Sequence, residues 1–207
     1  MDYSDISNRI PLNNMPLLEQ IVRSSEWFMS ALTHVRTLQL SSWCIGAGAI
    51  RNLVWDHLHG YGDPSALPDL DVAYFEPNDL RGETDAQLKQ QLDLRSPAVP
   101  WEVTNQAAVH LWFQGYFGYP VLPLRSLEEA VASWPEYATC VGIHLSHNDK
   151  INIVAPHGLA DLFELRVRHN PVRASLQTYR ERTEKSSAES AGLKSRYCYA
   201  LKNPNSS

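Results

Sequence analysis

The stretch W-C-I-G-A-G-A-I-R-N, at residues 43–52, decides the fold expected for this chain. Its first residues are apolar and end at Gly46, which predicts a short buried strand over residues 42–46. The following residues have helical spacing and stop before Gly60, which predicts a helix over residues 49–59. A strand that turns through glycines into a helix exposes backbone N–H groups at the helix N-terminus, and such groups suit the binding of phosphates.

Five residues of this loop are candidates for contact with a nucleotide: Gly46, Ala47, Gly48, Arg51 and Asn52. Glycine lets a ligand come close to the backbone, where a side chain would block it. Arg51 stands one turn into the predicted helix, where it can add a charge-assisted hydrogen bond to a phosphate oxygen. The alternative is an ordinary strand-to-helix turn that binds nothing.

A second motif, D-L-D-V-A-Y-F at residues 69–75, alternates polar and apolar residues and predicts a strand. Asp69 and Asp71 then share one face of the sheet, while Leu70 and Val72 point into the core. Two carboxylates ~4 Å apart repel each other by ~1 kcal/mol in water and by ~4 kcal/mol at an effective dielectric constant of ~20. A divalent cation removes that repulsion, and hard oxygen ligands favour Mg²⁺ or Mn²⁺ over zinc. The alternative is an exposed strand face or a capping aspartate.

A third carboxylate comes from Glu102, on a short strand predicted over residues 101–103. Together with Asp69 and Asp71 it can complete a three-carboxylate cluster. Such a cluster, with two metal ions ~3.5–4 Å apart, would hold the attacking and leaving oxygens of an in-line phosphoryl displacement. We expect Asn105, just beyond this strand, to cap the next helix, and the alternative is contact with the nucleotide.

The remaining periodicity predicts more helices than strands. Further helices are expected over residues 16–38, 82–94, 106–117, 158–165 and 172–185, and from Ser126, where S-x-x-E has the capping-box pattern. A hairpin is expected from residues 137–145 and 150–154 with its turn at residues 147–149. This order predicts an α+β (α/β) sheet covered by helices on at least one face. The aromatic run between Trp112 and Tyr119 is interpreted as mostly core, with room for one ring to stack on a base.

The length of 207 residues predicts one domain over residues 1–185, which includes the N-terminal helix, and a partly disordered basic tail over residues 186–207. Residues 166–207 hold nine Lys and Arg and three acids, whereas the first 165 residues hold nine Lys and Arg and twenty acids. The acidic body argues against broad polynucleotide binding. The basic stretch leaves room for a tRNA or protein acceptor. Its cations are Arg173, Arg180, Arg182 and Lys185.

The location expected from the sequence is the cytoplasm. Residues 1–9 are polar and acidic, unlike a signal peptide, and no apolar run approaches the ~18 residues that a membrane span needs. The three cysteines, Cys44, Cys140 and Cys198, form no C-x-x-C pair, so we expect free thiols in a reducing compartment.

The dinucleotide-binding fingerprint is a competing interpretation, because G-x-G is followed by an acidic residue about twenty positions later. The position of its third glycine is held by Arg51, however. Recognition of a ribose also does not require the D-x-D pair.

Four blocks of sequence, taken in order, resemble the DNA polymerase β-type nucleotidyltransferase superfamily. They are W-C-I-G-A-G-A-I-R-N at 43–52, D-L-D-V at 69–72, P-W-E-V-T-N-Q-A-A-V-H-L-W at 100–112 and A-P-H-G-L-A-D-L-F at 155–163. The chain is more closely similar to a bacterial family of uncharacterised nucleotidyltransferase-like proteins, from about residue 40 to residue 179.

The resemblance implies a mixed sheet flanked by helices, with the glycine loop on the triphosphate of an NTP. It further implies that Asp69 and Asp71 bind Mg²⁺ and that Glu102 is the third acid. One departure is Ala49, where many members carry glycine or serine after the loop. A second is the twenty residues between Gly48 and Asp69, which make a longer connection than many members have.

The expected function is therefore Mg²⁺-dependent transfer of a nucleoside monophosphate from an NTP to a hydroxyl acceptor, with release of pyrophosphate. The acceptor is left open between a small molecule, tRNA and a protein. Two alternatives remain: a nucleotide-binding module of the same fold without turnover, favoured by Ala49, and a metal-dependent phosphodiesterase or nuclease that uses the same acids.

Overall fold

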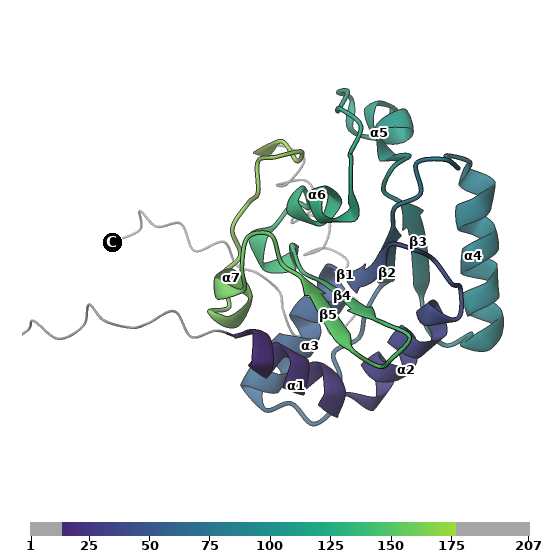
Figure 1. Cartoon of the computed structure of the whole chain (residues 1–207). Coiled ribbons are helices and arrows are strands. Elements are labelled where there is room, and N and C mark those ends of the chain that lie inside the picture. Colours follow the sequence, from purple (N-terminus) through teal and green to yellow (C-terminus); the bar gives the residue numbers. More distant parts are fainter. Residues whose placement is uncertain (1–13, 177–207) are drawn as a thin grey trace, which may run out of the picture.

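The computed structural model describes residues 14–176 and shows one five-stranded sheet with helices around it (Figure 1). The strand order is β3-β2-β1-β4-β5, in which β2 and β3 are parallel and the other neighbours are antiparallel. The mixed sheet expected from the sequence is therefore confirmed. The strands are β1 (Trp43–Gly46), β2 (Leu70–Tyr74), β3 (Trp101–Asn105), β4 (Gly142–Leu145) and β5 (Ile151–Val154).

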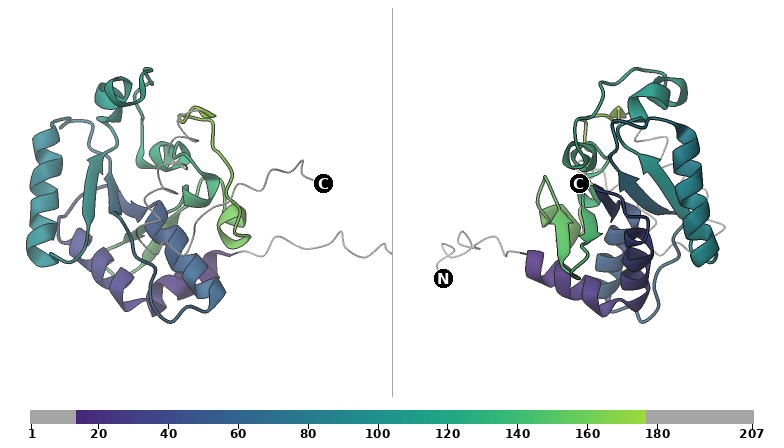
Figure 2. Two further views of the ribbon diagram at one scale, coloured as in Figure 1. Left: turned by 180° about the vertical axis from the view of Figure 1, so that it is seen from behind. Right: turned by 45° about the vertical axis from the view of Figure 1, so that its right-hand side comes forward.

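The helices divide between the two faces of this sheet (Figure 2). α2 contacts β4, α3 contacts both β1 and β2, and α4 contacts β3. α1 packs on α2 and α3. α6 covers part of the opposite face, and α5 follows directly after β3. The helices are α1 (Met15–Ser24), α2 (Glu26–Arg36), α3 (Gly48–His59), α4 (Gly82–Arg95), α5 (Val109–Phe117), α6 (Leu127–Ala132), the 3-10 helix η1 (Tyr137–Thr139) and α7 (Ala160–Phe163).

The alternation of side chains along the strands produces two cores of unequal size. On the larger side, Ile45 of β1 and Val72 of β2 are register partners and are almost fully buried against the helices. On the opposite side, Cys44 and Ala73 are register partners and pack with Val131 of α6. This second face carries Asp71 of β2 and Glu102 and Thr104 of β3, because side chains alternate between faces with a period of two.

The prediction of one continuous helix over residues 16–38 is wrong, because the structure has two helices there, α1 and α2. Ser25 has extended dihedral angles (φ −94°, ψ 102°) and separates α1 from α2. Its Oγ accepts a hydrogen bond from the backbone N–H of Phe28 at 3.4 Å, which makes Ser25 the N-cap of α2. Serine competes with the helix for backbone hydrogen bonds and therefore favours a cap over a helix interior.

Asn105 does not cap α5, contrary to the prediction. The N-cap of α5 is Ala108, and Asn105 instead fastens the loop after β2. Its Nδ2 donates to the carbonyl oxygens of Glu76 (2.8 Å) and Asp79 (2.7 Å), and its Oδ1 accepts from the N–H groups of Glu76 (3.0 Å) and Ala107 (3.1 Å). A fully satisfied buried amide of this kind fixes the end of the parallel strand pair.

Two other predictions need correction at their boundaries. Residues 137–139 form the 3-10 helix η1 before β4 starts at Gly142, and the helix predicted over 158–165 is only the single turn α7. Of the helix predicted over residues 172–185, the structure describes residues 172–176, and residues 172–175 are not helical, contrary to the prediction. The rest of this helix, the domain boundary predicted at residue 185 and the tail over 186–207 lie outside the described residues. The same holds for Arg180, Arg182, Lys185 and Cys198.

Within residues 14–176, no helix is long and apolar enough to cross a membrane. Cys44 and Cys140, both in this range, are buried free thiols, as expected.

Candidate active site

The parallel pairing of β2 with β3 brings two of the predicted acids together. Asp71 and Glu102 are direct register partners. Neighbouring strands lie ~4.8 Å apart, and partner residues point to the same face, so the two carboxylates share one side of the sheet. Asp71 is partly buried and Glu102 is exposed. The pair therefore stands where the covered part of this face meets solvent.

Asp69 lies just before β2 and is exposed to solvent. Strand pairing starts at the next residue, where the N–H of Leu70 donates to the carbonyl oxygen of Pro100 at 2.7 Å. Leu70 and Val72 are each only 1% exposed on the helix-covered side, as predicted, which directs Asp71 to the other face.

These acids fit a hard divalent cation by their chemistry and by the face that they share. The geometry fits it only in part. Residues 14–176 contain no group of three or more His, Cys, Asp or Glu side chains that are close enough together to hold a metal ion. Asp71 and Glu102 share one face of the sheet, whereas Asp69 lies outside the strand and is exposed.

The connection from β1 to α3 is tighter than the sequence indicates. Ala47, the N-cap of α3, has φ 54° and ψ −126°, a conformation in which a residue with a Cβ is strained. α3 begins at Gly48, and the residues in its first turn supply backbone N–H groups without acceptors in the helix itself. Strain of this kind, held in place by the surrounding structure, occurs often at ligand sites.

Arg51 is held beside this turn by two side chains. Its Nε and Nη2 each lie 3.2 Å from Oδ1 of Asn52, and its Nη1 lies 3.4 Å from Oε2 of Glu136. The guanidinium carbon also lies 5.6 Å from the ring centroid of Trp55. A Cβ placed on Gly48 would be 3.8 Å from Nη2 of Arg51, so the cation stays near the start of α3. Asn52 is buried and orients this arginine.

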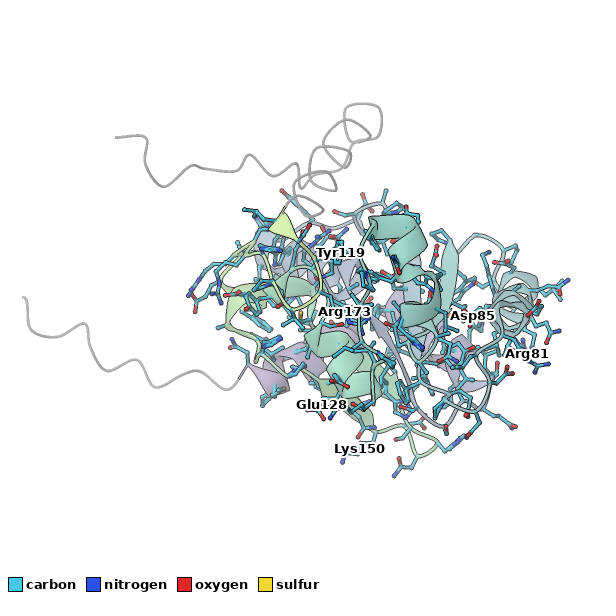
Figure 3. All side chains as sticks on the ribbon, turned by 90° about the horizontal axis from the view of Figure 1, so that it is seen from above. Arg81, Asp85, Tyr119, Glu128, Lys150 and Arg173 are labelled. Atoms are coloured by element: carbon cyan, nitrogen blue, oxygen red, sulfur yellow. The ribbon has the colours of Figure 1, made fainter. Side chains whose placement is uncertain are left out.

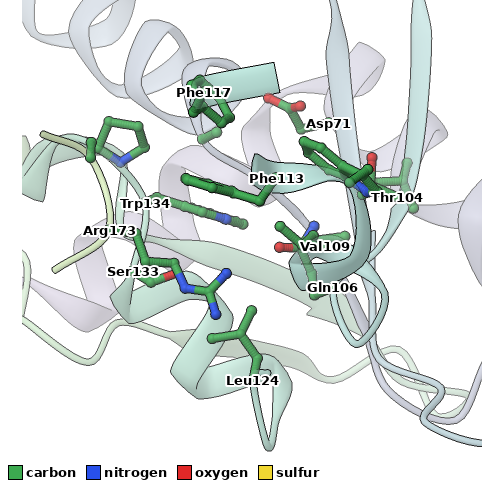
Figure 4. Close-up of a pocket in the computed structure, with 16 residues that line it drawn as sticks. Asp71, Thr104, Gln106, Val109, Phe113, Phe117, Leu124, Ser133, Trp134 and Arg173 are labelled. Atoms are coloured by element: carbon green, nitrogen blue, oxygen red, sulfur yellow. The ribbon is translucent and has the colours of Figure 1, made fainter. Parts of the chain in front are cut away.

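A cavity of ≈ 230 Å³ opens on the same face of the sheet (Figure 4). Both Asp71 and Ala47 line it. Its other walls come from β3, α5, the turn after α6 and the segment around residue 173. Besides Asp71 and Ala47, the lining residues are Val72, Ala73, Thr104, Gln106, Val109, Trp112, Phe113, Phe117, Leu124, Ser133, Trp134, Pro135, Arg173 and Ala174.

The aromatic run of α5 is less buried than the sequence suggested. Phe113 is 7% exposed, but Trp112 is 46% and Tyr116 is 74% exposed, so these two are not core residues. Trp134 is another aromatic residue of the cavity, and sequence reasoning missed it. A Cβ on Gly46 would lie 2.2 Å from Cη2 of Trp134, so this ring occupies the space that a side chain at position 46 would need.

Cys44 of β1 is a fully buried neighbour of Asp71. Burial, with the charge of Asp71 as the smaller cause, raises the pKa of the Cys44 thiol to about 12. Cys44 is therefore a protonated thiol, packed with Ala73 and Val131 on the same face of the sheet as Asp71. In such a setting, an ionised carboxylate interacts strongly with any cation that binds to it.

Comparison with known proteins assigns the class. A family model described as "Nucleotidyltransferase" matches residues 33–191, which is most of the chain. The chain belongs to this nucleotidyltransferase family. No curated protein matches it.

Two solved structures are similar to the chain. One, an NMR structure described as revealing "a CCA-adding enzyme head domain", shares 25% sequence identity and a TM-score of 0.68, over 89% of this chain and 95% of the other. This likeness confirms the polymerase β-like fold. The other, a "tRNA-processing enzyme (apo form I)", shares 15% identity and a TM-score of 0.44, over 90% of this chain and 44% of the other.

Proposed function

We propose that this nucleotidyltransferase moves a nucleoside monophosphate from an NTP to an acceptor hydroxyl group, with the acids of β2 and β3 at the reaction centre. The observation that carries the proposal is the register pairing of Asp71 with Glu102 beside the strained entry to α3. Asp71 and Ala47, the N-cap of α3, both line one cavity, so a carboxylate and the free N–H groups at the helix start lie close to it. An NTP needs both, because its charge is neutralised by a cation and its phosphate oxygens accept hydrogen bonds.

Each predicted residue has a role in this scheme. The backbone of Gly46, Ala47 and Gly48 turns the first N–H groups of α3 towards the triphosphate, and Arg51 adds positive charge beside them. Asn52 acts through Arg51, because its Oδ1 accepts from the guanidinium group.

The reaction itself is an in-line displacement. The acceptor oxygen forms a bond to the α-phosphorus, the bond from that phosphorus to the bridging oxygen breaks, and pyrophosphate leaves with the electron pair. Glu102 is exposed and takes the proton of the attacking hydroxyl group. Mg²⁺ or Mn²⁺ held by Asp69, Asp71 and Glu102 would supply neutralisation of the charge that accumulates on the phosphates.

A nucleotide-binding module without turnover is the second candidate. The observation that favours it is that three potential metal ligands do not gather around one point within the described residues. The two candidates differ in whether labelled nucleotide becomes covalently attached to an acceptor.

The experiment is incubation of the protein with each α-labelled NTP and Mg²⁺ in a cell extract. The variant is Asp71→Asn, and the matched control is Asp93→Asn, since Asp93 is a half-exposed acid of α4 whose ion pair within residues 14–176 is with Lys89, one helical turn away. We expect label on RNA, protein or a small metabolite with the wild type and the control but not with Asp71→Asn. The RNA fraction is the first to inspect, because the similar NMR structure is described as a CCA-adding enzyme head domain. Nucleotide binding without any labelled product would instead support the module.

A further inference from the structure

The cavity beside Asp71 is larger than the proposed chemistry of the phosphates requires. Its ≈ 230 Å³ lie below the ~300–1,000 Å³ of pockets that enclose a whole ligand, so it has room for one ring system. In the view of Figure 4, Asp71 and Arg173 stand at opposite ends of the lining, and Phe113 and Trp134 lie between them. An NTP with its phosphates at the Asp71 end would therefore extend its base towards Arg173.

The walls of the middle part are aromatic. Phe113 comes from α5, and Trp134 comes from the turn after α6. Phe113 is already ordered by Phe117 and Tyr119, whose ring centroids lie 4.4 Å and 5.4 Å from its own. Trp134 is fixed against the backbone of Gly46. Rigid aromatic rings that line a narrow cavity are the surfaces on which nucleobases stack.

Arg173 at the far end is fixed in position but only partly satisfied. Its Nη2 donates to the carbonyl oxygen of Leu122, and its guanidinium carbon lies 5.9 Å from the ring centroid of Phe113. Tyr119 holds its backbone, because the phenol donates to the carbonyl oxygen of Arg173 at 2.6 Å and accepts from the N–H of Ser175 at 3.0 Å. Figure 3 shows Tyr119 and Arg173 side by side.

The second terminal nitrogen of Arg173, Nη1, is buried and has no hydrogen-bond partner within the described part of the chain. Buried donors are nearly always paired, so an orphaned guanidinium nitrogen on a cavity wall indicates an acceptor supplied by a ligand. Burial also lowers the pKa of Arg173, because burial disfavours the charged form of the guanidinium group.

We propose that this cavity is the nucleobase site of the donor NTP, in which the base stacks on Phe113 and Trp134 and a base carbonyl oxygen accepts a hydrogen bond from Nη1 of Arg173. The inference rests on the proposed function for the position of the phosphates. It adds a substrate preference to that function. Guanine, cytosine and uracil each carry a carbonyl oxygen, whereas adenine carries none, so ATP is the poorest ligand of the four.

The test is calorimetric titration of the full-length protein with GTP, CTP, UTP, ATP and inorganic triphosphate, each with Mg²⁺. The four NTPs are expected to bind more tightly than inorganic triphosphate, because only they can stack. The three NTPs with a base carbonyl are expected to bind about tenfold more tightly than ATP, the difference that one charged hydrogen bond makes.

Two variants examine the two parts of the site. Arg173→Met keeps the length of the side chain and is expected to remove the difference between ATP and the other NTPs, with no change for inorganic triphosphate. Phe113→Leu is expected to bring all four NTPs closer to inorganic triphosphate. The matched control is Arg95→Met, because Arg95 lies on α4 and its Nη1 donates within its own helix, to the carbonyl oxygen of Gln91. Its affinities should equal those of the wild type.

Equal affinities of the wild type for all four NTPs, or unchanged preferences in Arg173→Met, would overturn the base site. If inorganic triphosphate still binds and Asp71→Asn abolishes that binding, the proposed function survives this result. If neither the NTPs nor inorganic triphosphate bind, both proposals fail. A Phe113→Leu or Arg173→Met variant that binds NTPs normally but an RNA acceptor poorly would assign the cavity to the acceptor and also overturn the proposal.

Discussion

Gly46 and Trp134 pack so closely that a Cβ at position 46 would fall 2.2 Å from Cη2 of the tryptophan. The sequence suggests that Gly46 lets a phosphate come near the backbone. In the structure, the absence of a side chain at Gly46 also leaves space for the ring of Trp134, which lines the cavity. The end of β1, the start of α3 and the wall of the cavity are thereby joined in one contact.

The first prediction concerns this contact. Gly46→Ala should destabilise the fold by about 1–3 kcal/mol, since the ring of Trp134 or the backbone has to move. The measurement is the free energy of unfolding in urea, with the fluorescence of the tryptophans as the signal. Gly62→Ala is the matched control, because no atom lies within 4 Å of a Cβ there and its φ is not positive. A loss of equal size in both variants would show that the contact is not tight.

Ala47 gives the second prediction, of opposite sign. Ala47→Gly should stabilise the protein by about 1 kcal/mol, because glycine adopts φ 54° without strain and this gain exceeds its entropy cost. The same urea titration measures it. A destabilised Ala47→Gly variant would contradict the strained conformation.

The third prediction concerns Asn105. Asn105→Ala should cost about 2–4 kcal/mol, because its buried amide takes part in four hydrogen bonds and the groups left behind remain unpaired. Thermal and urea unfolding both report this loss. Asn152→Ala, which removes a single long hydrogen bond on β5, should change stability by less than about 0.5 kcal/mol. Similar effects of the two substitutions would argue against the role of Asn105.

These positions show how far sequence reasoning reached. The alternation around Asp71 predicted its strand and its face, because a period of two is a local property of the chain. The same holds for the strand at Glu102. The contact of Gly46 with Trp134 joins residues far apart in the sequence, and no local pattern indicates it. Arg173 was noted only as part of a basic stretch, since its orphaned nitrogen is a property of the packed cavity.

The break at Ser25 has a different cause. The apolar residues before and after it keep helical spacing, so periodicity alone predicts one continuous helix. The serine side chain, however, satisfies a free N–H of α2 and makes a helix start there. A capping residue inside a stretch of helical periodicity can therefore mark the boundary between two helices, which the periodicity does not reveal.

The fourth prediction concerns thiol reactivity. Cys44 is fully buried, and its pKa is raised to about 12, so at pH 8 only about one molecule in ten thousand holds it as thiolate. Because the shift is upward, the reactive thiolate appears only as pH rises towards that value. Alkylation followed by mass spectrometry of the Cys44 peptide should show protection in the native protein and full labelling in urea. Rapid native labelling at pH 8 would contradict the burial of this thiol.

The fifth prediction tests the central claim, that Asp69 and Asp71 bind the metal ion that accompanies a nucleotide. The measurement is calorimetric titration of GTP with and without Mg²⁺ into the wild type, the Asp69→Asn/Asp71→Asn double variant and Asp93→Asn. We predict Mg²⁺-dependent binding by the wild type and by Asp93→Asn, and loss of that binding in the double variant with the unfolding temperature kept. Mg²⁺-dependent affinity that is unchanged in the double variant would contradict the account.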